Sequence, residues 1–120
     1  MIPRGVLTAL AVLAYLGMLA HNVISLPQLP LLSADNLAPL VVYAGLIASY
    51  WAWPRSSVVA ALLVSWTVVN VLVGGVLTVL PLPFLPFEPE QTPSHYVAHA
   101  LYVAAGLPLT IAAMRLFRAN

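Results

Sequence analysis

Three histidines are the residues of this 120-residue chain best suited to chemistry, and two of them lie four positions apart. That spacing puts the imidazoles of His95 and His99 on one helix face, where both can bind one metal ion. His21 or Glu90 could supply a third ligand. The competing interpretation, which we favour from the sequence, places His95 at the membrane interface and lets His99 only hydrogen-bond across helices. A metal site at His21, His95 and His99 is therefore the alternative to simple packing.

The sequence gives weaker support to haem binding and to catalysis than to a metal site. A haem held by two histidines needs them on two helices at matched depth, and only His21 with His95 or His99 could provide such a pair. Glu88 and Glu90 are explained as acids beside a helix N-terminus, where the dipole favours negative charge. The chain has no cysteine, no serine–histidine–aspartate arrangement and no glycine-rich phosphate loop. No catalytic set is visible, so an enzyme is not the expected class.

The composition indicates a protein whose surface is mostly lipid. Hydrophobic residues make up 62% of the chain and charged residues 6%, whereas a soluble domain carries about 25% charged residues to keep its surface wetted. The net charge is +1, and there is no basic patch that could bind nucleic acid. We expect one integral membrane domain over residues 1–120 and no separate soluble module.

The charged residues divide the chain into four charge-free runs, each long enough for a transmembrane helix. Lipid offers the backbone no hydrogen-bond partners, so these runs should be helical. They lack the alternating polarity of a membrane β-barrel. We predict a four-transmembrane-helix bundle, with Asp35 or Asn36 as the N-cap of its second helix. The predicted helices cover approximately residues 3–24, 37–53, 58–80 and 94–117.

The arginines predict how the bundle is oriented. Four crossings place all four arginines on one side of the membrane and all three acids on the other. The positive-inside rule then puts the arginines and both termini in the cytoplasm. A lysine-free chain rich in Ala, Leu and Val is associated with GC-rich bacterial genomes, so we expect a multi-pass protein of the bacterial cytoplasmic membrane. The three histidines then lie toward the outer leaflet.

Helical spacing predicts which faces meet inside the bundle. Small and polar residues mark packed faces in lipid, and each predicted helix carries such a stripe. The stripes comprise Thr8, Ala11, Tyr15, Met18 and Asn22; Asn36, Tyr43 and Tyr50; Thr67, Asn70, Gly74 and Thr78; and His95, His99, Tyr102, Gly106 and Thr110. From the stripes and the adjoining loop we select five candidate ligand-binding residues. These are His95, His99, Tyr102, Glu90 and Asn70.

Three functions from different classes remain open. Short loops and the lack of a catalytic set favour a small accessory or assembly subunit that binds a larger membrane complex. The first alternative is a protein that binds a metal, haem, quinone or lipid near its outer face. The second is a homo-oligomeric channel or transporter, whose polar stripe would face a symmetry axis. An intramembrane carboxylate typical of proton-coupled exporters is missing.

Overall fold

The computed structural model describes residues 1–120 and is helical throughout, with no β-strand. Its four α-helices are α1 (Arg4–Ser25), α2 (Ala34–Ala52), α3 (Ser57–Val69) and α4 (Pro93–Ala119). After α3 the helix continues as a π-helical segment, η1 (Asn70–Val76), and ends in a 3₁₀ turn, η2 (Leu77–Val79). The prediction of an all-helical protein is confirmed.

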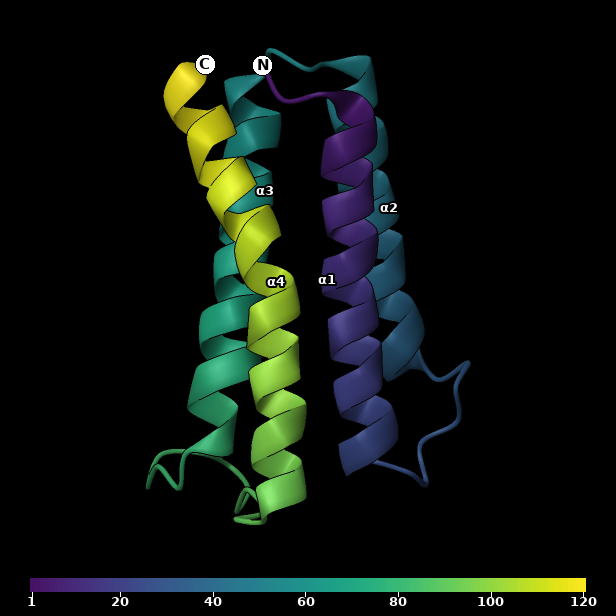
Figure 1. The fold of residues 1–120 in the computed structure, drawn as a ribbon, viewed down its shortest axis with the longest axis vertical. Helices are drawn as coiled ribbons and strands as arrows, with labels where there is room; N and C mark the ends of the chain where they lie inside the picture. Colours follow the sequence, from purple (N-terminus) through teal and green to yellow (C-terminus); the bar gives the residue numbers. More distant parts are fainter.

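The helices lie side by side and alternate in direction (Figure 1). Both termini and the short connection between α2 and α3 lie at one end, which we call the terminal end. The connections 26–33 and 80–92 lie at the opposite end, which we call the loop end. The most extensive helix contact joins α1 to α4, and α1 also packs against α2, while α3 packs against α4. Residues late in α1 and early in α4 are thereby brought together at the loop end.

Polar caps define two of the helix starts. The Ser56 hydroxyl accepts from the backbone N–H of Val59 (3.3 Å), and the Thr92 hydroxyl accepts from that of His95 (3.4 Å). Each cap satisfies an N–H that has no partner inside its helix. The predicted helices 3–24, 58–80 and 94–117 agree with the observed ends to within two residues.

The second helix begins earlier than predicted, at Ala34 and not at 37. The N-cap position is Ser33, whose side chain makes no capping hydrogen bond. The prediction that Asp35 or Asn36 caps this helix is therefore wrong. Asn36 lies within the first turn and is only 2% exposed. Its side chain makes tertiary hydrogen bonds, described below, that outweigh its preference for a cap.

The π-helical segment η1 was not predicted. The backbone N–H of Leu77 bonds to the carbonyl of Leu72, five residues earlier, as a π-turn requires. Here the backbone of Gly74 packs closely against α4. A β-carbon on Gly74 would lie 2.8 Å from the Tyr102 hydroxyl oxygen, so only glycine fits without a shift. Hydrophobic periodicity alone cannot signal this widened turn.

The polar stripes turn into the bundle. The buried residues of α2 are the predicted ones, Asn36, Tyr43 and Tyr50. In α4, His99, Tyr102, Gly106 and Thr110 are buried, while His95 is partly exposed. The large apolar core lies in the half nearer the terminal end. Its twelve buried residues are Leu7, Ala11, Ala14, Tyr43, Tyr50, Val59, Ala60, Leu63, Leu109, Ala112, Ala113 and Leu116.

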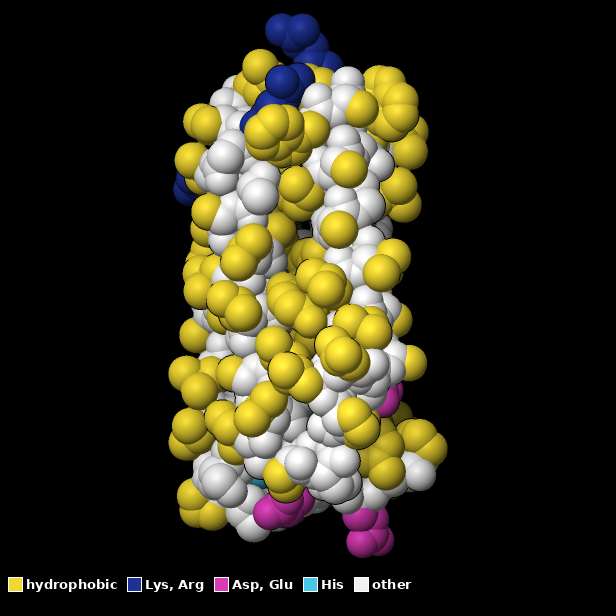
Figure 2. All heavy atoms as spheres, turned by 90° about the vertical axis from the view of Figure 1, so that its right-hand side faces the viewer, with side chains coloured by type: hydrophobic (Ala, Val, Ile, Leu, Met, Phe, Trp, Pro, Cys, Tyr) yellow, Lys and Arg dark blue, Asp and Glu magenta, His cyan; other side chains and the backbone are white.

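The outer surface has a broad apolar band between two charged ends. Figure 2 shows the arginines gathered at the terminal end and acidic side chains at the loop end, with apolar side chains between them. Three helices are long and apolar enough to cross a membrane: Arg4–Ser25, Ser57–Val79 and Pro93–Ala119. α2 is not among them; its first turns contain Asp35, Asn36 and Pro39. Three apolar helices of this length support membrane association.

Candidate metal centre

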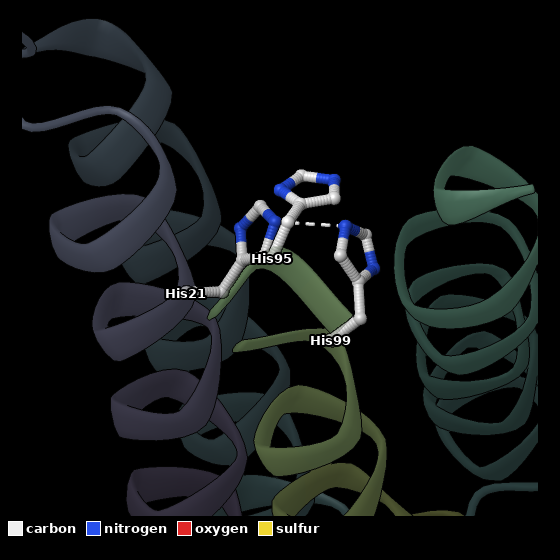
Figure 3. A group of neighbouring side chains, drawn as sticks. All are labelled: His21, His95 and His99. Atoms are coloured by element: carbon white, nitrogen blue, oxygen red, sulfur yellow. Dashed lines mark hydrogen bonds between the residues drawn. The ribbon is translucent and has the colours of Figure 1, made fainter. Parts of the chain in front are cut away.

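Three imidazoles meet at the loop end of the bundle. His21 projects from the last turns of α1, and His95 and His99 project from the first turns of α4 (Figure 3). The ring centroid of His99 lies 4.3 Å from that of His21 and 4.6 Å from that of His95. One ring nitrogen from each histidine lies within 4.8 Å of the other two. The cluster arises because α1 packs on α4 and because one helical turn separates His95 from His99.

Two asparagines determine which nitrogen of His21 carries a proton. The Asn36 amide nitrogen donates to the carbonyls of Pro30 (3.3 Å) and Leu31 (3.1 Å), so its amide oxygen points the other way. That oxygen accepts from the amide nitrogen of Asn22 (2.8 Å). The Asn22 oxygen then faces Nδ1 of His21 at 2.9 Å. An amide oxygen can only accept, so Nδ1 is the protonated nitrogen and Nε2 of the neutral ring has a free lone pair.

A backbone carbonyl orients His99 in the same way. Nδ1 of His99 lies 2.9 Å from the carbonyl oxygen of Gly75 in η1. A carbonyl can only accept, so Nδ1 donates and Nε2 of the neutral ring is unprotonated. The ring is 4% exposed, and burial leaves it little freedom to turn. The π-helical segment thus supplies the acceptor that orients His99.

The two unprotonated nitrogens face each other. Nε2 of His21 and Nε2 of His99 are 3.0 Å apart. Two lone pairs at this separation repel unless a cation lies between them, either a proton or a metal ion. Nitrogens bound 2.0–2.1 Å from a tetrahedral ion would be ~3.3–3.4 Å apart. The observed gap therefore differs by only a few tenths of an ångström from the one that a shared ion requires.

His95 is the least constrained of the three. Nδ1 of His95 lies 3.2 Å from the hydroxyl oxygen of Ser25, which can donate or accept. The side chain is partly exposed, in contrast to His99. One nitrogen of each ring lies within 4.8 Å of the other two, compared with ~3.3–3.4 Å in a tetrahedral set, so the rings must close by up to roughly 1.5 Å around an ion. A change of side-chain rotamer can supply a movement of this size.

The other predicted site residues lie around the histidines. Tyr102 is directly beneath them, with its ring centroid 5.7 Å from that of His21. Its hydroxyl donates to the Asn70 amide oxygen (2.8 Å), and the Asn70 nitrogen donates to the carbonyl of Trp66 (2.8 Å). Glu90 lies outside them, and its carboxylate accepts from the Thr92 hydroxyl (2.8 Å). Tyr102 and Asn70 therefore form a hydrogen-bonded layer below the cluster, and Glu90 lies at its outer side.

A haem between His21 and His99 does not fit this arrangement. The macrocycle must lie between its two axial ligands, whereas the two Nε2 atoms are 3.0 Å apart. There is room for a single ion in this gap and none for a flat ring.

Sequence reasoning did not identify the four partners of the histidines, which are Asn22, Asn36, Ser25 and the Gly75 carbonyl. The usable signal was the position of Asn22 and Asn36 on the predicted inward stripes. The role of Asn36 depends on how the 26–33 connection places α2 against α1. The role of Gly75 depends on the π-helical turn.

Comparison with known proteins adds no family assignment: no family model, curated protein or solved structure matches the chain.

Proposed function

We propose that this chain is a membrane protein whose histidines bind a divalent transition-metal ion, such as Zn²⁺, near the outer face. The observation that supports this function is the pair of facing Nε2 atoms of His21 and His99, 3.0 Å apart. The Nδ1–H of each ring donates to an oxygen behind it. The acceptor is the amide oxygen of Asn22 for His21 and the carbonyl oxygen of Gly75 for His99. Metal-binding histidines are almost always oriented by such a partner. Imidazole ligands suit zinc, copper, iron and nickel.

The proposed membrane arrangement has four crossings with both termini in the cytoplasm. Although α2 is less apolar than the others, its 19 residues rise ~28 Å, close to the ~30 Å hydrocarbon thickness. It also lies alongside α1 between the two ends of the bundle (Figure 1). The arginines at the terminal end favour a cytoplasmic location for that end. The metal centre would then face the outside of a bacterial cytoplasmic membrane.

A reporter fusion tests this topology. A reporter placed after Asn120 should read cytoplasmic, and one inserted near Gln28 should read external. A cytoplasmic signal at Gln28 would contradict the four-crossing arrangement.

An accessory role in a larger complex is compatible with metal binding. Exposed apolar side chains cover all four α-helices, and a partner could replace lipid on any of them. Co-purification of a second subunit from native membranes would support this role. A homo-oligomeric channel would need its polar stripe to face a symmetry axis. The buried polar residues do not support it, because they lie inside the chain's own bundle; they are Asn36, Thr67, His99 and Thr110.

A zinc titration of the purified protein tests metal binding. We expect one ion per chain. His99→Ala should lower the zinc affinity by at least about 100-fold, because losing only a residue that hydrogen-bonds to a ligand already costs about 10–100-fold. Ser94→Ala, an exposed change at the start of the same helix, is the matched control and should bind like the unmodified chain. Binding should weaken as the pH falls, because protons compete with the metal ion for the imidazole nitrogens. Equal zinc affinity in all three proteins would contradict the proposal.

A further inference from the structure

A cavity of about 360 Å³ opens directly outside the three histidines. The imidazoles form part of its lining, together with Ser25 and Leu26 at the end of α1 and Thr78 in η2. The loop that carries Glu88 and Glu90 lines it as well. A water molecule occupies ~30 Å³ in the liquid, so the cavity has room for about ten waters or for a small solute beside the histidines.

The chain offers a bound ion three neutral imidazole nitrogens, and no carboxylate converges with them. Only His21, His95 and His99 converge among the residue types that commonly bind metals. The Glu90 carboxylate is exposed and accepts from Thr92. The Thr78 hydroxyl donates to the Gly74 carbonyl (2.8 Å). A tetrahedral ion held by three histidines keeps one position for a ligand from outside the protein.

We propose that this fourth position faces the cavity and takes an exchangeable small ligand, either water or a small monodentate anion. The inference rests on the proposed metal site and specifies what that site binds. Gly75 lies behind His99 and Tyr102 lies beneath His21, so the side of the cluster that lines the cavity is the open one. Three neutral imidazoles leave both positive charges of the ion uncompensated, so an anion can bind the ion directly. Glu88 and Glu90 in the cavity lining oppose an anion, which is why water is the other ligand proposed.

Azide is a suitable probe because it is a small monodentate anion. The cobalt(II)-loaded full chain in detergent would be titrated with azide while its visible absorption is recorded, since this absorption reports the coordination of cobalt. We expect a saturable spectral change at one azide per cobalt. Leu26→Trp should narrow the cavity and weaken azide binding while cobalt still binds.

The possible results separate the two proposals. Cobalt bound at one ion per chain with a spectrum that azide does not alter would overturn the exchangeable position and leave the metal site in place. Failure of cobalt to bind would instead contradict the metal site itself. An azide affinity that is unchanged in Leu26→Trp would show that the ligand enters from another side and overturn the assignment of the cavity. If Leu26→Trp does not fold, the azide titration of the unmodified chain still decides the proposal.

Discussion

In the half of the bundle nearer the terminal end the helices meet mainly through apolar side chains, whereas in the half nearer the loop end hydrogen-bonded polar groups are buried beside apolar ones such as Met18 and Val79. Leu63 and Leu109 are fully buried in the half nearer the terminal end, which we call the apolar half. In the half nearer the loop end, which we call the polar half, the buried side chains include Asn36 and His99, each hydrogen-bonded to another segment. The same four-helix framework thus supports two kinds of interior. Packing alone accounts for the apolar half, while the polar half places specific atoms.

The polar half also contains a feature that packing alone does not require. Hydrogen bonds that hold the bundle together would be complete if every donor met an acceptor. The partners of His21 and His99 instead leave two unprotonated nitrogens facing each other, and this pair needs a shared proton or a metal ion. Substitutions in the two halves should therefore separate the stability of the fold from metal binding.

The largest effect is expected from removing one ligand in the polar half. With zinc at 1,000 times its dissociation constant, the unmodified chain should gain ~4 kcal/mol in unfolding free energy. His99→Ala should gain at most ~1.4 kcal/mol, because an affinity lower by at least about 100-fold leaves zinc at no more than about ten times its dissociation constant. Denaturant titration in detergent, with and without zinc, measures both values. A gain of the same size in His99→Ala would place the zinc elsewhere.

A substitution that leaves a void in the apolar half should lower the stability of the fold and leave zinc binding unchanged. Leu63→Ala should lower the unfolding free energy by ~2–5 kcal/mol, because Leu63 is 0% exposed and its removal leaves a void. Its zinc affinity should stay unchanged, since the core cluster that contains Leu63 includes none of the three histidines. Unfolding and zinc titrations on the same preparation provide the comparison. A large loss of zinc affinity would mean that the two halves are coupled.

The glycines on the polar stripes test how closely α3–η1 packs against α4. A β-carbon at Gly74 or Gly106 would lie 2.8 Å from its nearest neighbour, the Tyr102 hydroxyl oxygen or the Val71 methyl. Gly74→Leu and Gly106→Leu should each cost ~1–3 kcal/mol of stability through overpacking. Val76→Leu, an exposed position in η1, should change stability by less than ~0.5 kcal/mol. Equal thermal stability of the three variants would count against closely packed inward stripes.

The smallest effect should come from the orienting network of His21. In Asn36→Leu the Asn22 amide loses the partner that fixes its direction, so Nδ1 of His21 is no longer held as the donor. We expect zinc affinity to fall about tenfold, which is the lower range for loss of an outer partner. Asn70→Leu is the matched control, because Asn70 bonds to Tyr102 and not to a histidine. Similar zinc affinities in the two variants would remove the role given to Asn36.

Much of the helical framework could be predicted from the sequence, because lipid forces each long apolar run into a helix. The inward stripes also followed from spacing, as Tyr43 and Tyr50 show. The meeting of His21 with His99 required knowing that α1 packs against α4, which spacing within one helix does not reveal. The protonation pattern required more, since Asn36 acts through Asn22 and the Gly75 carbonyl belongs to a π-helical turn. These contacts come from tertiary structure and leave no periodic signal in the chain.

X-ray absorption spectroscopy of the zinc-loaded protein tests the metal centre most directly, because it reports which atoms surround the ion and how far away they are. The metal site predicts three imidazole nitrogens at about 2.0–2.1 Å and one further ligand such as the oxygen of water. His95→Ala should lower the imidazole number to two, because it removes one of the three rings. A zinc ion surrounded only by oxygen, or one whose imidazole number is the same in both proteins, would contradict a centre formed by His21, His95 and His99.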